Sequence, residues 1–297
     1  MFDNVLVGID GQEAGTDAVA LARELAGPGA SLVLANVYDE PWLPSRATDA
    51  AHGPDHLAAA QRILADVCRG LDDAVERVPK QATSPARGLH ELAEDRDSDL
   101  LVMGSCRRGA IGRVMLGDDT RAGLSGAPCA VAVAPRGYAA KRTGLASIGV
   151  GYDGSRESAG ALAAARELAA QTGARVRLLQ VVTVATYPFW GVGPAAGPRV
   201  DELVAATEAE LAGLEGVDTE VRYGLPQLDL AEFSKEVDLL VMGSRGYGPA
   251  MRMIAGSTST HLLRNSRAPL LILPHGARRS RAGESDDDAG TQRPQLV

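Results

Sequence analysis

The sequence of 297 residues is poor in aromatic residues, which make up 4% of it, and in cysteine. Its three cysteines show no C-x-x-C spacing, which argues against a disulfide framework and against a zinc site. The net charge is −8, which argues against sequence-independent binding of nucleic acid, because such binding needs clustered positive charge. The longest apolar stretches, such as Ala30–Val37 and Leu270–Leu273, have the length of strands and are too short to span a bilayer.

What is present is enough apolar sequence for two domains. The chain is long for one compact domain, and with 45% hydrophobic residues each half can bury a core. The first residues lead directly into the apolar run Val5–Ile9, without a basic segment or a cleavage site. We therefore expect a cytoplasmic protein with no membrane and no nucleic-acid partner.

A tandem repeat organises the sequence. Asp99–Ser105 reads DLLVMGS and recurs unchanged as Asp238–Ser244, 139 residues later. Other landmarks recur in the same order, namely Val5–Gly11 with Ile148–Gly154, Ala22–Ala26 with Ala165–Ala169, and Ala127–Pro128 with Ala268–Pro269. We interpret the chain as a duplication of a unit of roughly 140 residues.

Short β-branched runs alternate with amphipathic stretches in each unit. The predicted strands are Val5–Ile9, Ser31–Val37, Ala74–Val78, Leu100–Met103 and Ala130–Ala134, then Ile148–Tyr152, Val176–Val182, Val217–Arg222, Leu239–Met242 and Leu270–Leu273. The helices predicted in the first unit are Gln12–Ala26, Asp55–Cys68, Leu89–Glu94 and Asp119–Ser125. This alternation predicts an α/β fold with parallel strands and helices on both faces of the sheet.

Two segments are predicted to lie outside the units. Residues 138–144 are expected to link them, because the surrounding stretch Arg136–Ala146 shows no apolar period. Residues 277–297 contain an Asp286–Asp288 run and almost no apolar side chain, which predicts a disordered tail.

A glycine-rich loop follows the fourth strand of the second unit. It reads G-x2-G-x9-G-[ST], with Gly243, Gly246, Gly256 and Ser257 at the defined positions. Glycines let backbone N–H groups approach a phosphate, and the hydroxyls of Ser257–Thr260 precede a helix predicted from His261 onward, whose N-terminus favours an anion. The alternative is that the glycines only make a tight turn and that Ser257 caps the helix.

The loop, the DLLVMGS strand and the V-G-x-D-G opening together resemble the universal stress protein family. The resemblance covers nearly the whole chain as two tandem domains, residues 1–137 and 145–276. It implies a doubly wound, five-stranded parallel sheet in each domain, of the adenine nucleotide α-hydrolase type, with strand order 3-2-1-4-5. It also implies that the fifth strands pair, so that the units form an internal pseudo-dimer, and that chains assemble into a homo-oligomer.

The resemblance further implies that ATP, with or without Mg²⁺, is held mainly by the backbone of the second unit. It assigns adenine and ribose to Gly151, Tyr152, Asp153 and Val181, and the phosphates to Met242, Gly243, Gly246, Gly256, Ser257 and Thr258; Ser259 belongs to the same run of hydroxyls. Asp153 either accepts hydrogen bonds from ribose or forms a turn that caps the next helix, and the two roles are compatible. Arg245 and Arg252 either add charge beside the phosphates or are solvated.

The first unit departs from this pattern. The positions that correspond to the ATP site are Asp10, Val37, Gly104, Arg107, Gly117 and Asp118. Arg107 replaces a glycine, and Asp118 places a carboxylate where a phosphate would bind; like unit charges about 4 Å apart repel by about 4 kcal/mol at an effective dielectric constant near 20. We therefore predict that the first unit binds ATP poorly or not at all. Cys106 in this loop is either an activated thiol or an inert one.

Other chemistry is not indicated. Gly149–Gly154 matches G-x-G-x-x-G, but Gly149 lies inside a predicted strand and no acidic residue ends the second strand, which argues against NAD. We find no P-loop lysine and no catalytic set. The sequence predicts an ATP-binding stress-response protein whose nucleotide sets its conformation or its choice of protein partner, with at most slow hydrolysis. The alternatives are a nucleotide-free scaffold and an adenylate-handling enzyme.

Overall fold

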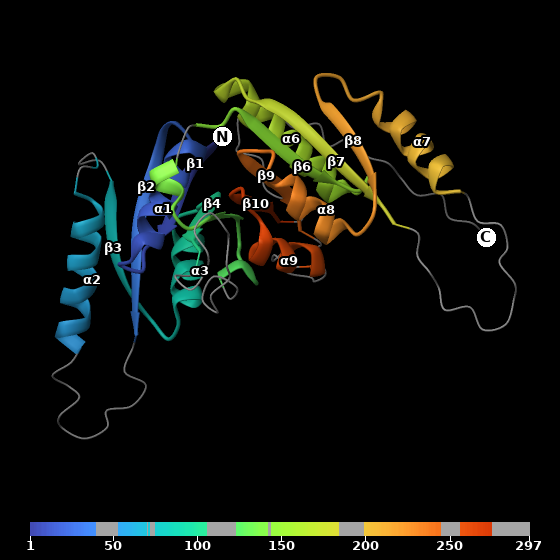
Figure 1. The fold of residues 1–297 in the computed structure, drawn as a ribbon. Helices are drawn as coiled ribbons and strands as arrows, with labels where there is room; N and C mark the ends of the chain where they lie inside the picture. The colour runs from blue at the N-terminus through green and yellow to red at the C-terminus, as the bar shows by residue number, and fades with distance from the viewer. Residues whose placement is uncertain are drawn as a thin grey trace, which may run out of the picture.

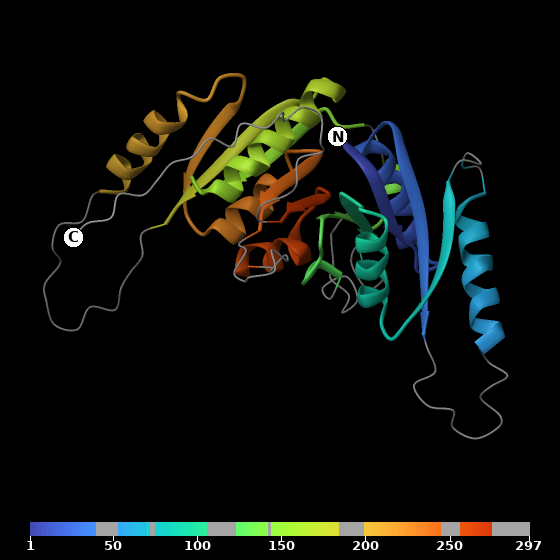
Figure 2. The same cartoon turned by 180° about the vertical axis from the view of Figure 1, so that it is seen from behind.

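The computed structural model describes residues 1–39, 53–69, 71, 75–105, 123–141, 144–183, 199–244 and 256–274. In these ranges the chain forms one ten-stranded sheet in the order β3-β2-β1-β4-β5-β10-β9-β6-β7-β8. Figures 1 and 2 show from opposite sides that the two units lie side by side along this sheet, with β3 and β8 at its outer edges. Each half has the strand order 3-2-1-4-5, so the predicted fold is confirmed.

The two units repeat the same order of elements. The first unit contains β1 (Phe2–Gly8), α1 (Glu13–Leu25), β2 (Ala26–Asp39), α2 (Gly53–Val67), β3 (Glu76–Ala82), α3 (Pro85–Asp95), β4 (Leu100–Gly104) and β5 (Ala130–Ala134). The short helix α5 (Tyr138–Lys141) follows. The second unit contains β6 (Ser147–Tyr152), α6 (Arg156–Thr172), β7 (Arg175–Val182), α7 (Val200–Leu211), β8 (Asp218–Tyr223), α8 (Pro226–Phe233), β9 (Leu239–Gly243), α9 (Ser257–Asn265) and β10 (Leu270–Leu273).

The two units join through their fifth strands. Neighbouring strands are parallel within each unit, whereas β5 and β10 pair antiparallel, with Ala132 opposite Leu271. The predicted internal pseudo-dimer is therefore confirmed. Because both strands are apolar and fully buried, pairing them within the chain removes two edges that would otherwise invite association.

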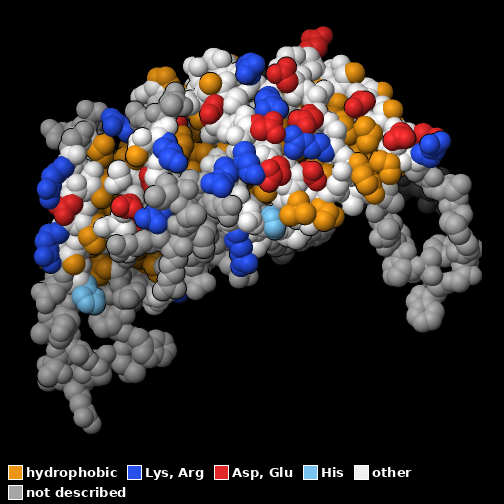
Figure 3. Space-filling model, in the orientation of Figure 1, with side chains coloured by type: hydrophobic (Ala, Val, Ile, Leu, Met, Phe, Trp, Pro, Cys, Tyr) orange, Lys and Arg blue, Asp and Glu red, His pale blue; other side chains and the backbone are white. Residues whose placement is uncertain are grey.

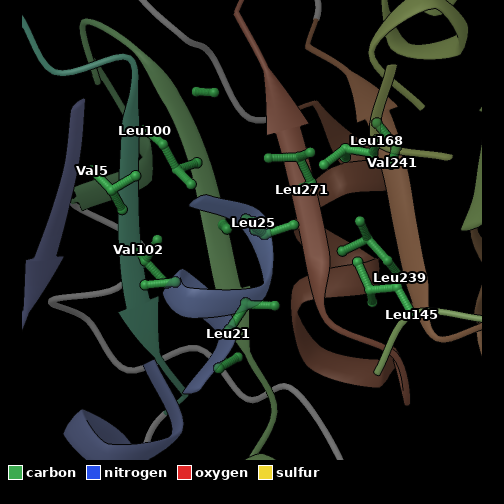
Figure 4. Close-up of a cluster of buried hydrophobic side chains, with 14 of the residues drawn as sticks. Val5, Leu21, Leu25, Leu100, Val102, Leu145, Leu168, Leu239, Val241 and Leu271 are labelled. Carbon is green, nitrogen blue, oxygen red and sulfur yellow. The ribbon is translucent and has the colours of Figure 1, made fainter. Parts of the chain in front are cut away.

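Helices cover both faces of the sheet, and each face has a core that runs through both units. Val5 and Val7 face the layer of α1, α2, α6 and α7, whereas Leu6 between them faces the layer of α3, α8 and α9. Figure 4 shows Leu25 and Leu100 of the first unit in one cluster with Leu271 of the second. A sheet covered on both sides explains why its strands read as continuous apolar runs.

Some boundaries differ from the sequence-based expectation for local reasons. Helix α3 begins at Pro85 rather than at Leu89, because the Ser84 hydroxyl accepts a hydrogen bond from the N–H of Arg87 at 3.3 Å and Pro85 suits the first turn. Strand β3 ends at Ala82 and contains Pro79, whose missing N–H is tolerated at an outer edge of the sheet.

The linking segment predicted at 138–144 contains helix α5, although its sequence shows no apolar period. None of the helices in the described ranges is long and apolar enough to cross a membrane. The domain boundaries predicted from the sequence stay a prediction.

Candidate functional site

The candidate site of the second unit lies at the carboxyl end of β6. Strand β6 is flanked by β7 on one side and by β9 on the other, so the strand order reverses here. Ligands of open parallel sheets bind at such a point, beyond the carboxyl ends of the strands. The structure places Gly151, Tyr152 and Asp153 at the end of β6 and Met242 and Gly243 at the end of β9.

Asp153 is exposed and forms the turn from β6 into α6. Its Oδ1 accepts a hydrogen bond from the N–H of Ser155 at 3.1 Å, and Gly154 between them has a φ of +75°. Ser155 is the N-cap of α6, since its hydroxyl accepts from the N–H of Ser158 at 3.2 Å. The turn interpretation of Asp153 is therefore confirmed, and this hydrogen bond fixes the carboxylate at the end of the strand.

Gly243 has a packing role. A Cβ at this position would lie 2.5 Å from the carbonyl oxygen of Glu157 in the first turn of α6. Gly104 is restricted in the same way, because its Cβ would lie 2.1 Å from the carbonyl oxygen of Ala14 in α1. Both glycines of the repeated DLLVMGS segment are therefore needed by the fold, whether or not a ligand binds.

Gly256 has no such role among the described residues. It is the N-cap of α9, its φ is −70°, and no described atom lies within 4 Å of the place of a Cβ. Helix α9 begins at Ser257 instead of His261, and no side chain of the described residues caps it. The interpretation that Ser257 caps the helix is therefore wrong, because Ser257 is already its first helical residue. Helix N-termini without a cap leave backbone N–H groups available to an anion.

The hydroxyl residues at the start of α9 differ in burial. Ser257 is exposed, Thr258 is half-buried and Ser259 is buried. The third of these side chains is thus turned into the protein, whereas the first two lie where a ligand could reach them.

The remaining predicted residues are placed as follows. Val181 lies in β7, half-buried against the core formed by α3, α8 and α9, and the Met242 side chain belongs to the same core. Tyr152 packs partly against the opposite core. Gly246, Arg245 and Arg252 lie outside the described residues.

Ser244 is a candidate site residue that the sequence reasoning missed. Its side chain is fully buried directly after β9, and its Oγ has no hydrogen-bond partner among the described residues. Ser105 repeats the same arrangement after β4. A buried hydroxyl without a partner is costly, so such a group points to a missing ligand or water. The signal was the last residue of the DLLVMGS repeat, a segment that the sequence analysis interpreted as evidence of duplication and of the family resemblance.

The first unit keeps the corresponding framework. Asp10 follows β1 and accepts a hydrogen bond from the N–H of Gln12 at 2.9 Å, while Val37 lies in β2 and Gly104 ends β4. Arg107, Gly117, Asp118 and Cys106 lie outside the described residues, and the predictions made for them stay predictions.

The cysteines that the structure describes are buried. Burial raises the pKa of the Cys129 thiol to about 12, so it stays protonated at neutral pH, and Cys68 is buried as well. Neither is a candidate nucleophile. In the described ranges no group of three or more His, Cys, Asp or Glu side chains is arranged to hold a metal ion.

Gly149, the first glycine of the G-x-G-x-x-G match, has a structural explanation. It lies inside β6, where a Cβ would come within 2.8 Å of the Phe233 ring. The guanidinium group of Arg177 lies over the Phe233 ring, with its carbon 5.1 Å from the ring centre. In the view of Figure 3, the basic and acidic side chains of the described residues are interspersed over the visible face.

The fold and the site define a class of protein: a tandem α/β chain with a candidate ligand site where the strand order of each unit reverses. The model of the universal stress protein family matches residues 1–135 and 145–274. The chain therefore belongs to the universal stress protein family and contains two tandem domains of it.

Full-length relatives share this organisation. A universal stress protein of Mycobacterium tuberculosis is 29% identical over 296 residues, which cover 91% of this chain and 99% of the relative. A universal stress protein of Mycolicibacterium smegmatis is 26% identical over 289 residues, covering 91% and 96%. The crystal structure of a universal stress protein from Archaeoglobus fulgidus is similar with a TM-score of 0.66 at 19% identity, covering 91% of this chain and 98% of its own. This last likeness shows the fold.

Proposed function

We propose that the second unit binds ATP at the carboxyl ends of β6 and β9, with the phosphates at the N-terminus of α9. The observation that carries the proposal is the start of α9 at Gly256, where no side chain of the described residues caps the helix and no described atom lies within 4 Å of a Cβ position. An anion from outside would satisfy the N–H groups of the first turn and be favoured by the helix dipole. Since neither φ nor packing against the described residues requires a glycine at 256, close approach of a ligand is a physical reason for one.

A second observation supports the same place. The Ser244 hydroxyl is buried directly after β9, in the segment that opens the glycine loop, and it has no hydrogen-bond partner among the described residues. A phosphate or ribose oxygen would provide the hydrogen bond that this hydroxyl lacks.

The nucleoside end of ATP would lie at the end of β6. Asp153 is exposed there, and its turn with Ser155 holds the carboxylate at the end of the strand, where it can accept hydrogen bonds from ribose hydroxyls. Val181 and Gly151 would contact the base. If Mg²⁺ accompanies ATP, the phosphates supply most of its ligands.

We infer that the nucleotide acts as a ligand that sets conformation or the choice of a protein partner in the stress response, in the cytoplasm. The sequence contains no catalytic set to hydrolyse it. Because β5 and β10 already pair with each other, a homo-oligomer would have to form through other surfaces. Light scattering of the purified chain measures that association.

The test is the number of ATP molecules that each chain binds, measured by calorimetry and by release of bound nucleotide. We expect one ATP per chain, retained in Gly117→Glu and lost in Gly256→Glu. Gly117 corresponds to Gly256 in the repeat, so the two variants are matched in chemistry and in place. Circular dichroism of Gly256→Glu should stay unchanged, because the described surroundings of Gly256 leave room for a side chain.

Two results would contradict the proposal. Two ATP molecules per chain would show that the first unit is intact in function, and equal binding by Gly256→Glu would place the nucleotide elsewhere. One glycine of the loop motif favours the alternative of a nucleotide-free scaffold. Gly243 is required by its packing against α6, whether or not a nucleotide binds. If the chain binds no nucleotide at all, the nucleotide-free scaffold is the better explanation of the glycine loop.

A further inference from the structure

The two outer edges of the sheet differ in how well they are protected. At the edge of the first unit, β3 contains Pro79, which has no N–H to offer to a further strand. At the edge of the second unit, β8 contains Glu220 in the equivalent place. Pro79 and Glu220 lie at the same distance before Pro85 and Pro226, the prolines that start α3 and α8. Among the described residues β8 pairs only with β7, so this edge lacks the proline that protects the other (Figure 1).

Exposed apolar side chains lie directly beyond β8. Tyr223 ends the strand, and Leu225 and Leu228 stand at the start of α8. Their exposed fractions are 52%, 48% and 50%, and in the described part of the chain these three are the exposed large hydrophobic residues. We call β8 together with Leu225 and Leu228 the β8 surface. Exposed apolar residues that gather at one place indicate an interaction surface.

The fold does not require leucine at these positions. Counted from the proline that starts each helix, Leu225 corresponds to Ser84 of the first unit, and Leu228 corresponds to Arg87. Ser84 caps α3, since its hydroxyl accepts a hydrogen bond from the N–H of Arg87 at 3.3 Å. Leu225 is the N-cap of α8 and makes no such bond. Because leucine is a poor N-cap and gains nothing from exposure to water, Leu225 needs an explanation other than folding.

The charges along β8 fit a second copy of the same strand in antiparallel orientation. Glu220 and Arg222 lie on one face of β8, on either side of Val221. Antiparallel pairing centred on Val221 would place Glu220 of each copy opposite Arg222 of the other. Opposite charges would thus meet twice, and Val221 would meet its own equivalent.

An ion-pair network already holds these two charged side chains in place. The Nε of Arg222 lies 2.5 Å from Oε1 of Glu220, and its Nη2 lies 3.2 Å from Oε1 of Glu236. The Nη2 of Arg177 lies 3.5 Å from Oε2 of Glu220. The network contains two arginines and two glutamates, so a second copy would extend a balanced cluster and would bring no excess charge of one sign.

The chain itself shows how two units of this fold join edge to edge. Strands β5 and β10 pair antiparallel, with Ala132 opposite Leu271, and the sheet continues from one unit into the other. That interface is closed within the chain. The β8 edge could join two chains by the same kind of pairing.

We propose that the β8 surface is an interface between two copies of this chain, in which two β8 strands pair antiparallel about a two-fold axis. Tyr223, Leu225 and Leu228 would bury apolar area against the second copy. The surface is small, so the dimer forms weakly and reversibly, with monomer at low micromolar concentration and dimer above it. The proposal names the surface of the homo-oligomer and rests on that part of the proposed function, but it does not depend on ATP binding.

The test is sedimentation velocity of the nucleotide-free full chain from micromolar to submillimolar concentration. We expect a monomer–dimer equilibrium, with the dissociation constant raised about 10-fold or more in Leu225→Ser, because a two-fold interface loses the leucine twice. This variant copies Ser84 of the first unit, and serine is the better N-cap, so it should fold. Ala170→Ser, at an exposed position of α6 outside the β8 surface, is the control and should leave the association unchanged.

A second pair of variants tests the strand edge itself. Glu220→Pro copies Pro79 of the first unit and should abolish the dimer, because it removes an N–H from the edge. Glu220→Ala is its matched control: it removes the same carboxylate but keeps the N–H, and should weaken the dimer by less. Hydrogen–deuterium exchange locates the interface, since the amides of β8 should exchange more slowly at high than at low protein concentration, while those of β3 should not change.

Three results would overturn the proposal. The first is a chain that stays monomeric at every concentration, which would leave the β8 surface to an extended segment of another protein. The second is a dimer with the same dissociation constant in Leu225→Ser and Glu220→Pro as in the unaltered chain. The third is equal exchange of the β8 amides at both concentrations.

Gly256→Glu separates this proposal from ATP binding. The variant should form the dimer as the unaltered chain does, whether or not it binds ATP, because Gly256 lies outside the β8 surface. Failure of the dimer and failure of nucleotide binding are therefore distinguishable. Circular dichroism of each variant shows whether it is folded.

Discussion

The two units turn from their first strand into their first helix by the same route but cap that helix differently. Asp10 and Asp153 each accept a hydrogen bond from the N–H two residues later, across glycines with φ of +78° and +75°. Ser155 then caps α6 with its hydroxyl, whereas Gln12 in the first unit makes no side-chain cap. The shared turn belongs to the architecture, and the cap is where the two copies have diverged.

The glycines teach the same distinction. Gly104 and Gly243 occupy equivalent places, and each is restricted by the same close contact with the first helix of its unit, α1 or α6, so their recurrence indicates packing. Gly256 has open space around it in the described structure, and no close contact accounts for it. A glycine that a close contact requires therefore says less about a ligand than a glycine that nothing in the described structure requires.

The largest effect should come from breaking the connection between the units. Leu271 is fully buried in β10, opposite Ala132 of β5, in a core that both units share. We expect Leu271→Ala to lower the free energy of unfolding by about 2 to 5 kcal/mol, through lost burial and a new cavity. Urea unfolding followed by circular dichroism measures it. Leu228→Ala is the control, since Leu228 is 50% exposed and should cost little.

The shared core also predicts that the unaltered chain unfolds in a single transition. Two separate transitions would show that the units are energetically independent, despite the continuous sheet.

The next effect compares the glycines directly. Gly104→Ala and Gly243→Ala should each lower the free energy of unfolding by about 1 to 3 kcal/mol or more, because the new Cβ meets a backbone carbonyl of α1 or α6. Gly256→Ala should cost less than about 1 kcal/mol, because no described atom meets the new Cβ and only the preference for glycine over alanine as N-cap is lost. Chemical denaturation of the three variants checks this order, and equal costs for all three would contradict it.

A smaller effect tests the difference between the caps. Ser155→Ala removes the hydroxyl that accepts from the N–H of Ser158 and should cost about 1 kcal/mol of stability. Gln12→Ala in the first unit should cost less than about 0.5 kcal/mol, because the Gln12 side chain makes no cap. Denaturant midpoints of the two variants measure the comparison, and the reverse order would show that the capping assignment is wrong.

The smallest effect concerns acid pH. Hydrogen bonds from two arginines hold the pKa of the Glu236 carboxyl below its ordinary value of 4.5. The bond from Arg177 has the larger effect, and the bond from Arg222 adds to it. In the first unit the Arg96 side chain lowers the pKa of Glu76 in the same way. A carboxyl with a lowered folded pKa contributes stability above pH 4.5, and that contribution is lost as the pH falls through the folded pKa.

Both carboxylates are largely exposed, so each contribution should be below about 1 kcal/mol. Glu236→Gln and Glu76→Gln should flatten the fall in stability below pH 4.5, measured by denaturation over a pH series. If the stability of the variants falls below pH 4.5 as steeply as that of the unaltered chain, neither ion pair contributes to the loss of stability in acid.

Much of the fold could be predicted from the sequence because period and repetition report it directly. The predicted strands Ala130–Ala134 and Leu270–Leu273 match β5 and β10 at both ends. The start of α9 could not be predicted, because the run from Ser257 to Thr260 consists of weak helix formers. The sequence predicted no helix or strand for residues 138–144, because the side chain that orders the start of this segment is Asp17, on a helix distant in the sequence. Its carboxylate accepts hydrogen bonds from the N–H groups of Gly137 and Ala139.

The candidate site was predicted in part. The sequence placed Asp153, Gly243 and Gly256 together at one edge of the sheet, and the structure has them at strand and helix ends there. Ser244 was missed, because only burial shows that its hydroxyl lacks a partner. Residues 106–122 and 245–255 are outside the described part, so Arg107, Asp118 and Gly246 stay predictions.

By itself the sequence determined the duplication, the alternation of strands and helices, and the family, since these follow from periodicity and from the order of motifs along the chain. Only the tertiary structure decided which glycines serve packing and which hydroxyls are buried without a partner among the described residues. The physical reason is that close contact and desolvation depend on atoms that are distant in the sequence. The approach of Gly243 to Glu157, and the hydrogen bond from the N–H of Gly137 to Asp17, exist only once the chain has folded.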